Sequence, residues 1–211
     1  MGDYSDLRQD YKYGELKDNI TGIDPLQLFS EWIEDARDAS QIEPNAMTLA
    51  TVDSGGRPHA RVVLLKEHVG REFVFFSNYH SDKGIELSHN PAASLVFWWD
   101  RLERQVRIEG LVSKIASTRS DIYFSKRPRK SQIGAWASDQ SKIIGSYHEL
   151  ESSFKKIEKK YPECVPRPEH WGGFGLLAER IEFWQGRTSR LHDRLNFYFV
   201  NEHWSRQRKA P

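Results

Sequence analysis

The segment SRLHDRLNFYFV (189–200) carries the residue types best suited to binding an anion. If it forms a strand, its side chains alternate between two faces, so Arg190, His192 and Arg194 project together. Guanidinium groups match the geometry of phosphate oxygens, and an imidazole exchanges protons near neutral pH. The spacing favours a site for an anionic, hydrogen-bonding ligand, with an ordinary solvated strand face as the alternative.

The other face of this segment is mostly apolar, which is typical of a strand packed on a core. A single carboxylate, Asp193, interrupts it. The apolar residues on this face are Leu191, Leu195, Phe197 and Phe199.

A second basic pair flanks an apolar stretch in RPHARVVLLK (57–66). Arg61 and Lys66 are five positions apart, so in an ideal strand they face opposite sides. They could serve one ligand only through a bulge, a strand end or main-chain contacts between them. The pattern by itself favours two charges at the ends of a buried strand.

The run KRPRK (126–130) is open to three interpretations. Basic runs occur in nuclear-localisation signals and nucleic-acid sites, but this run is short and the overall charge is balanced. It could be a solvated helix end before Pro128. It could also form a phosphate pocket with Tyr123 and Ser131, whose hydroxyls add neutral donors.

Composition excludes several other classes of protein and site. The 211 residues include 31 Lys and Arg against 30 Asp and Glu, a net charge of +1, which argues against a general nucleic-acid binder. Cys164 is the only cysteine, so neither an intrachain disulfide nor a cysteine-based zinc cluster is possible. Because the sequence has no HExxH, G-x-S-x-G, Walker A or G-x-G-x-x-G motif, we expect no metal site and no Rossmann-type nucleotide site.

The hydrophobic periodicity predicts a mainly β fold with peripheral helices. Asp24 followed by Pro25 is typical of a helix start, and apolar residues follow at helical spacing. Later strand patterns are joined by short turns, among which we count WGGFG (171–175), and this favours an antiparallel barrel. Helices are predicted over 24–40, 81–90, 118–126 and 147–160, and strands over 46–52, 58–66, 72–77, 93–99, 104–115, 173–178, 180–186 and 190–201.

The N-terminal end of the chain differs from the rest. Residues 1–20 are polar and weakly patterned, which predicts a mobile arm, and 21–211 should form a single domain. The first residues lack the apolar stretch of a signal peptide, and no apolar run approaches the ~18 residues of a membrane span. We therefore expect a cytoplasmic protein with no membrane partner.

Several motifs follow one another in an order typical of one enzyme family: RVVLLK (61–66), ASLVFWW with LERQVRIEG (93–99 and 102–110), SQIGAWAS (131–138), and EFWQG with SRLHDR (182–194). Through these motifs the chain closely resembles the pyridoxine/pyridoxamine 5′-phosphate oxidase family over nearly its full length. The resemblance implies an FMN-binding split β-barrel. It also implies a homodimer with FMN at the subunit interface and a C-terminal region for dimerisation and substrate binding.

The resemblance further implies which residues hold the cofactor. The contacts come from the 61–66 strand, including its backbone, and from positions scattered along the rest of the chain. The implied FMN set is Arg61, Val62, Val63, Leu64, Lys66, Phe76, Ser77, Lys83, Gln105, Gln140, Ser141, Trp184 and Arg194.

The implied reaction is oxidation of pyridoxine or pyridoxamine 5′-phosphate to pyridoxal 5′-phosphate, with oxygen as acceptor and hydrogen peroxide released. Arg190 and His192 would lie over the pyridine ring as the catalytic pair, and Arg8 and Tyr11 of the arm would close the site. The substrate phosphate would be held by Lys66, Tyr123, Arg127 and Ser131. Two alternatives are a split-barrel flavin reductase with another substrate and a non-catalytic carrier of flavin or pyridoxal phosphate.

Two positions depart from the family pattern. Family members usually carry arginine immediately before the lysine equivalent to Lys83, whereas this chain has Asp82. A carboxylate there repels a phosphate, so a cofactor contact at this position is in doubt. The tail WSRQRKAP also differs from the usual ending, and nothing follows from that.

Overall fold

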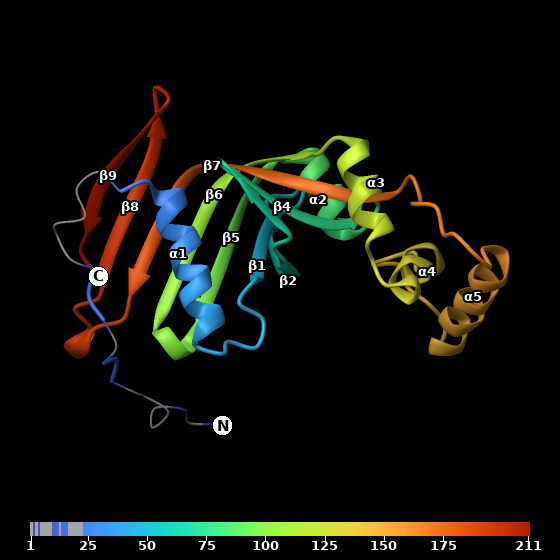
Figure 1. Ribbon diagram of the computed structural model, residues 1–211, viewed down its shortest axis with the longest axis horizontal. Helices are drawn as coiled ribbons and strands as arrows, with labels where there is room; N and C mark the ends of the chain where they lie inside the picture. The colour runs from blue at the N-terminus through green and yellow to red at the C-terminus, as the bar shows by residue number, and fades with distance from the viewer. Residues whose placement is uncertain (1, 3, 5–9, 13, 17–22) are drawn as a thin grey trace. The chain divides into compact units, whose positions relative to one another are not determined.

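The computed structural model describes residues 2, 4, 10–12, 14–16 and 23–211 (Figure 1). Arg8 and much of the predicted arm lie outside this part. The chain divides into two compact units, each assembled from segments that are far apart in the sequence. Unit 1 comprises Met1–Leu49, Ser94–Gly110 and Ala178–Pro211, and unit 2 comprises Ala50–Ala93 and Leu111–Leu177.

The described residues form five α-helices and nine strands. The helices are α1 (Pro25–Asp38), α2 (Asp82–His89), α3 (Ser117–Ser125), α4 (Arg129–Ala137) and α5 (Tyr147–Lys160). The strands are β1 (Ala46–Val52), β2 (Pro58–Leu64), β3 (Glu67–Val69), β4 (Glu72–Asn78), β5 (Ala92–Trp99), β6 (Arg104–Lys114), β7 (Trp171–Gln185), β8 (Asp193–Val200) and β9 (His203–Lys209). They pair in the order β2-β1-β5-β6-β7-β4-β3, with β8 paired to β7 and β9 paired to β8.

Strand β7 has two antiparallel partners in succession. Its first part pairs with β4, from Trp171 opposite Asn78 onward, and its second part pairs with β8, from Arg180 opposite Tyr198 onward. The sequence pattern predicted two strands here, over 173–178 and 180–186. The hydrogen-bonded register makes them one strand of 15 residues.

In unit 1, α1 packs its apolar stripe on aromatic residues of the sheet. The predicted helix start is confirmed, since the Asp24 carboxylate accepts a hydrogen bond from the Leu26 N–H at 2.9 Å. The Phe29 ring lies edge-on to Phe97 at 5.2 Å, and Trp32 lies edge-on to Phe183 at 5.1 Å. These contacts fix α1 to β5 and β7 through side chains at helical spacing.

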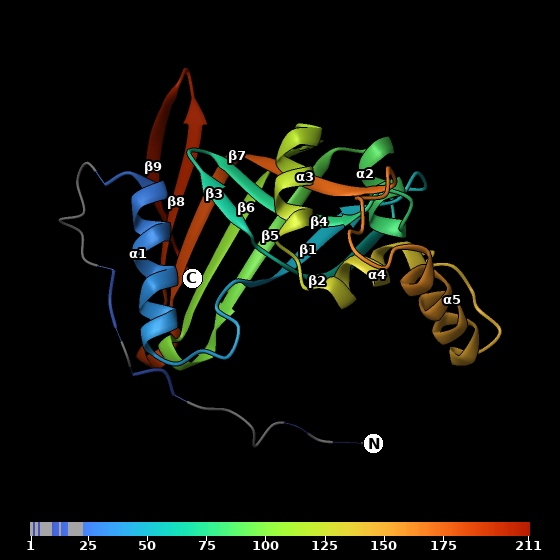
Figure 2. The ribbon, with the colours of Figure 1, turned by 45° about the vertical axis from the view of Figure 1, so that its right-hand side comes forward.

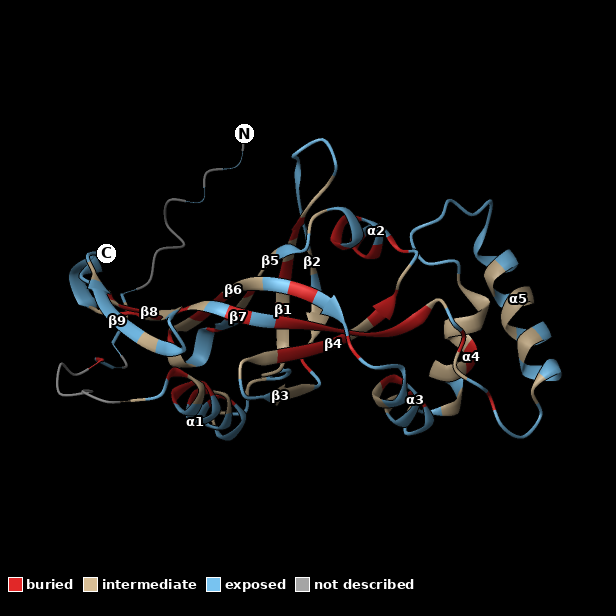
Figure 3. Ribbon diagram, turned by 90° about the horizontal axis from the view of Figure 1, so that it is seen from above, coloured by how far each residue is buried: buried red, intermediate tan, exposed pale blue. Residues whose placement is uncertain are grey.

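In unit 2, β4 and the facing part of β7 form the most buried region (Figure 3). A second cluster consists of Phe124, Ile133, Val165 and Trp171, and it joins α3 and α4 to the start of β7. Helices α4 and α5 lie side by side (Figure 2). Helix α5 has no fully buried residue, so its amphipathic pattern predicted its existence but not a deep core.

The segment WGGFG, expected to be a turn, is part of β7, so that expectation was wrong. Gly172 and Gly173 are buried, and neighbouring side chains occupy the space that a Cβ would need. A Cβ on Gly172 would lie 2.0 Å from the Tyr79 hydroxyl, and one on Gly173 would lie 2.4 Å from Ile115 Cδ1. The glycines therefore admit side chains from neighbouring elements rather than bend the chain.

Gly173→Ala is expected to destabilise the protein by about 1–3 kcal/mol, because the new methyl group overlaps Ile115 and Phe76 in a packed region. A matched control is Gly134→Ala in α4, where no atom lies within 4 Å of the added Cβ and alanine favours helix. Urea unfolding of both variants checks this. Equal stability of the two would contradict the close-packing explanation.

Candidate active site

Unit 2 contains a cavity of about 1170 Å³. Its walls come from β2 and β4, from α2, and from the segment that joins α3 to α4. Two cationic groups line it, one around Arg127 and the other around Arg61. The predicted site residues on its walls are Arg61, Val62, Val63, Leu64, Lys66, Phe76, Ser77, Lys83, Tyr123, Arg127, Ser131, Gln140 and Ser141.

The first cationic group depends on a break between two helices. Helix α3 ends at Ser125, and Pro128 is the N-cap of α4. This break brings Tyr123, Arg127 and Ser131 to the same cavity wall. Of the three interpretations of KRPRK, the geometry therefore favours the phosphate pocket.

The protein itself does not satisfy all the hydrogen-bond donors of the Arg127 side chain. Its Nη1 atom is buried and has no hydrogen-bond partner. Burial lowers the pKa of Arg127, because desolvation disfavours its charge. Burial also raises the pKa of Tyr123, which keeps its hydroxyl protonated and able to donate. A partly buried guanidinium with an unused, buried donor is suited to an anionic ligand.

The second cationic group is organised by a carboxylate. Glu86 is 5% exposed and accepts hydrogen bonds from Arg61 at 2.8 Å, from Thr51 and from His59. Burial acts to raise the pKa of Glu86, but these hydrogen bonds outweigh it and the pKa is lowered. The carboxylate therefore stays ionised and fixes the Arg61 guanidinium on the cavity wall.

Lys83 adds a second cation to this group. It is 7% exposed and donates to Ser81 Oγ at 3.1 Å. Burial, and then the neighbouring Arg61 guanidinium, lower the pKa of Lys83. Two cations so close together raise the free energy of the site, and a bound anion would relieve that cost.

Lys66 lies beyond the end of its strand. Strand β2 stops at Leu64, and the Lys66 N–H donates to the Val74 carbonyl oxygen at 2.8 Å. The prediction of a strand through position 66 was two residues too long. The strand end is one of the arrangements that allow Arg61 and Lys66 to serve one ligand, and both line the cavity.

The loop after α4 closes on the cavity through polar contacts. Gln140 Oε1 lies 3.3 Å from the Asn78 N–H, and Ser141 Oγ accepts from the Asp82 N–H at 3.3 Å. Asp82 is exposed in the first turn of α2, where a carboxylate complements the helix dipole. Its side chain also lines the cavity, so it brings negative charge there.

In unit 1 the predicted row of Arg190, His192 and Arg194 on one strand face was wrong. Strand β8 begins only at Asp193, and both Ser189 and Arg190 have left-handed backbone, with φ of 56° and 60°. Two consecutive non-glycine residues in this region are costly for the backbone. Leu191, expected in the core, is 68% exposed for the same reason.

His192 is held by two rings and one main-chain hydrogen bond. Its ring lies 4.6 Å from Trp184 and 5.4 Å from Tyr11. The Arg187 N–H donates to His192 Nδ1 at 3.1 Å, so the neutral ring carries its proton on Nε2. Burial, and then the Arg190 charge, lower the pKa of His192. Near neutral pH the imidazole is therefore uncharged and presents an Nε2–H donor.

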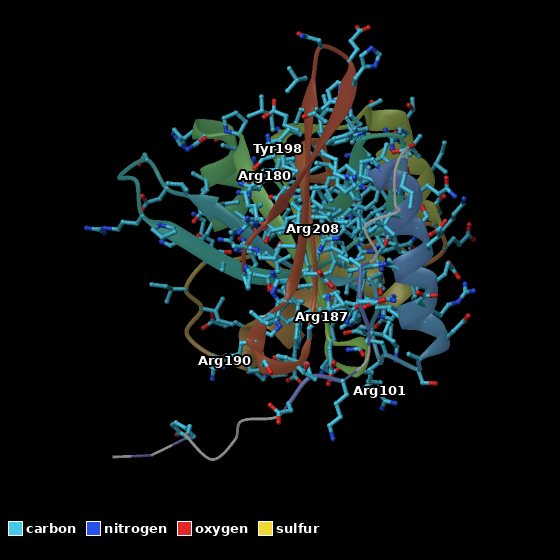
Figure 4. The ribbon with its side chains drawn as sticks, turned by 90° about the vertical axis from the view of Figure 1, so that its left-hand side faces the viewer. Arg101, Arg180, Arg187, Arg190, Tyr198 and Arg208 are labelled. Atoms are coloured by element: carbon cyan, nitrogen blue, oxygen red, sulfur yellow. The ribbon has the colours of Figure 1, made fainter. Side chains whose placement is uncertain are left out.

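A buried carboxylate anchors the described part of the arm. Asp193 is 6% exposed and accepts from the Leu16 N–H at 3.0 Å. It also pairs with Arg187 at 3.3 Å and with Arg208 at 2.5 Å. In the view of Figure 4, Arg208 lies above Arg187, and Arg190 lies below Arg187 and to its left. The interruption of the apolar pattern at Asp193 thus marks an anchor for Leu16 of the arm.

A second buried carboxylate organises the polar face of the unit 1 strands. Glu182 is 3% exposed and pairs with Arg194 at 2.9 Å, with Arg107 at 3.3 Å and with Arg180 at 3.5 Å. Burial acts to raise the pKa of Glu182, but the Arg194 hydrogen bond and the Arg107 charge outweigh it and the pKa is lowered. Trp184 follows on the same strand, and Gln105 lies on β6.

Four residues of this arrangement were not predicted as functional: Glu86, Trp171, Glu182 and Asp193. Three are carboxylates that hold arginines, and their sequence neighbours give no sign of that partner. Only Asp193 was visible in the sequence, as a charge on an apolar face.

Among the described residues, no group of three or more His, Cys, Asp and Glu side chains could hold a metal ion. No helix in that same part is long and apolar enough to cross a membrane.

Comparison with protein families gives two matches that together span most of the chain. Residues 33–161 match the family described as pyridoxamine 5′-phosphate oxidase. Residues 171–211 match the pyridoxine 5′-phosphate oxidase C-terminal dimerisation region. The first match alone covers more than half of the chain.

Curated relatives cover almost the whole chain. The pyridoxine/pyridoxamine 5′-phosphate oxidase of Thermosynechococcus vestitus is 54% identical over 207 residues, which is 98% of each chain. The enzyme of the same name from Pseudomonas putida is 52% identical over 210 residues, again 98% of each chain.

Two solved structures show the same fold. PhzG from Burkholderia lata, solved with tetrahydrophenazine-1-carboxylic acid, has a TM-score of 0.89 and 26% identity, covering 94% of this chain and 99% of its own. A pyridoxamine 5′-phosphate oxidase-related, FMN-binding protein from Nostoc punctiforme has a TM-score of 0.73 and 15% identity, covering 90% and 100%. The predicted fold class, a mainly antiparallel split β-barrel with peripheral helices, is confirmed.

Proposed function

We propose, since the chain belongs to the pyridoxine/pyridoxamine 5′-phosphate oxidase family, that it oxidises pyridoxine or pyridoxamine 5′-phosphate to pyridoxal 5′-phosphate. Oxygen is the electron acceptor and hydrogen peroxide is released. The observation that carries this proposal is the unit 2 cavity, which has two separate cationic groups for two phosphates. Arg127 serves the substrate phosphate, and Arg61 with Lys83 serves the phosphate of FMN.

FMN is the cofactor, and the residues around Arg61 fit its phosphate. Lys83 and Arg61 are neighbouring cations on a buried wall, and an anion between them would remove their mutual repulsion. Ser77, Gln140 and Ser141 add uncharged hydrogen-bonding groups on the same cavity. The backbone of residues 61–66 with Phe76, and Gln105, Trp184 and Arg194 of unit 1, complete the proposed FMN set.

The protein's part in the reaction is to hold the substrate and stabilise charge. When bound, FMN supplies the redox ring that takes a hydride equivalent from the exocyclic carbon of the substrate and returns the electrons to oxygen. Arg127, Tyr123 and Ser131, with Lys66, clamp the substrate phosphate, and each charge-assisted hydrogen bond contributes about 1.5–3 kcal/mol. A fixed phosphate determines where the reactive carbon lies.

Arg190 and His192 are the proposed catalytic pair. The uncharged His192 donates through Nε2, and the exposed Arg190 supplies a full positive charge for the pyridine ring. Tyr11, which lies against His192, would close the site together with Arg8. The protein works as a homodimer with FMN at the subunit interface. The match of residues 171–211 to a dimerisation region supports the homodimer. The cytoplasmic location stays a prediction.

The test is the visible spectrum of the purified protein before and after anaerobic addition of pyridoxamine 5′-phosphate. We expect flavin bands that bleach on addition and return with oxygen, together with peroxide. NADH and a reduced phenazine carboxylic acid serve as the other reductants. Bleaching by NADH alone would indicate a flavin reductase, bleaching by the tricyclic acid alone an oxidase of such tricyclic acids, and no bleaching a carrier. Each of these three results would overturn the proposal.

A further inference from the structure

Arg127 differs from the other arginines that shape the two units. Arg61 and Arg194 each lie beside a buried carboxylate, at 2.8 Å and 2.9 Å. Arg127 has no carboxylate within ion-pair distance among the described residues, and its Nη1 is buried without a hydrogen bond. Something other than opposite charge must therefore hold its guanidinium in place.

The ring of Trp171 holds the Arg127 guanidinium in place of a carboxylate. The Arg127 guanidinium carbon lies 4.3 Å from the centre of the Trp171 ring and 5.7 Å from that of Phe124. A cation over the face of an indole is attracted by the ring's electrons, and tryptophan is the strongest of the aromatic residues in this role. The attraction orients the cation without neutralising it.

Trp171 is itself rigidly held. It is 7% exposed, and its ring stacks on Phe76 at 5.6 Å with planes 14° apart. Phe76 stacks in turn on Tyr123 at 3.8 Å. The main chain of Trp171 is fixed by its pairing with Asn78, and its carbonyl oxygen accepts from Arg167 at 2.6 Å. One stack of rings thus supports both Tyr123 and Arg127.

We infer that Trp171 is a positioning residue for substrate-phosphate recognition, which it performs by holding the Arg127 guanidinium over its ring with the charge still available. This rests on the proposed function of Arg127. A carboxylate in the same place would also hold the guanidinium, but it would offset the positive charge, as Glu86 does for Arg61, where Lys83 adds a second cation. The aromatic ring does not offset the charge.

The test is a pair of variants in the FMN-loaded enzyme, Trp171→Leu and Trp171→Phe. Trp171→Leu removes the ring, and we expect the KM for pyridoxine 5′-phosphate to rise about 10- to 30-fold with kcat within about twofold. Trp171→Phe keeps a ring and should fold even if the leucine variant does not, with a rise of about threefold. Both should bind unphosphorylated pyridoxal as the wild type does. A merely structural role would weaken pyridoxal binding and FMN retention as well, and that result would overturn the inference.

A double-mutant cycle with Arg127→Gln, which removes the cation, separates this inference from the proposed function. If Trp171 acts through Arg127, Trp171→Phe should have no further effect in the Arg127→Gln background. The same four proteins can be compared by the rise in Tm that inorganic phosphate produces in the holoenzyme, which needs no turnover. Should the wild type oxidise neither vitamer, the proposed function fails, but the phosphate-induced rise still decides the role of Trp171. Additive effects of the two substitutions on that rise would refute it.

Discussion

Arg190→Ala is expected to lower kcat about 100-fold or more while leaving FMN bound. The Arg190 side chain is exposed, and within the described residues it forms no ion pair, so its charge is available to a substrate ring. Removing one preorganised donor that stabilises charge in a transition state typically costs 10²- to 10³-fold, about 3–4 kcal/mol. Peroxide release gives the turnover, and the visible spectrum gives the bound FMN.

Arg101→Ala is the matched control for this substitution. Arg101 is another exposed arginine of unit 1, in the 3-10 turn Asp100–Leu102 (Figure 4). We expect its loss to leave kcat within about twofold, as for an ordinary surface change. A colourless Arg190→Ala protein that regains normal activity on FMN addition would assign Arg190 to cofactor binding instead.

Glu182→Ala should destabilise the protein by about 3 kcal/mol, because it leaves three arginines of a partly buried cluster without their shared carboxylate. We expect a loss of stability at the lower end of the range for breaking a buried ion pair, since the three arginine side chains are 23–30% exposed. Urea unfolding measures it. The control is Glu179→Gln, an exposed position on the same strand, which should change the stability by less than about 0.5 kcal/mol.

The same carboxylate should contribute to acid sensitivity. The pKa of Glu182 is lowered in the folded state, so its contribution to stability is present above the unfolded pKa and is lost as the pH falls through the folded value. Glu182→Gln should therefore differ most from the wild type in stability near neutral pH, and the difference should shrink only as the pH falls below the ordinary glutamate pKa of about 4.3. A constant difference between the two proteins from neutral to acid pH would show that the charge of Glu182 is not the cause.

The parts of the fold that could be predicted are those that depend on residues close together in the sequence. Helix α1 has its cap, its proline and its apolar stripe within 15 consecutive residues, and its start was predicted to the residue. Strand β7 depends on partners about 100 positions earlier and 8 to 18 positions later, so its continuity could not be read from its own residues. The glycines after Trp171 looked like turn residues because Tyr79 and Ile115, whose side chains lie against them, are remote in sequence.

The predictions for the candidate site follow the same rule: those that needed only neighbouring residues agree with the structure better than those that needed distant ones. The phosphate-pocket interpretation of the segment around Arg127 needed only residues of two short helices and of the segment between them, and these do line one cavity. The row of Arg190, His192 and Arg194 assumed regular strand geometry, which the left-handed backbone at Ser189 and Arg190 breaks. Glu86 and Glu182 were missed because an ion pair between distant residues leaves no periodic pattern. The FMN cofactor and the family were predicted from the ordered motifs, not from any of these patterns.

The interleaving of the two units limits how this protein can be divided. Each unit takes its residues from either side of the other along the chain, and β7 supplies both. No uninterrupted fragment of the gene can encode one whole unit without also encoding part of the other. Neither unit could therefore be fused to another protein, duplicated or exchanged by itself. Such a rearrangement of the gene has to include the coding sequence of both units.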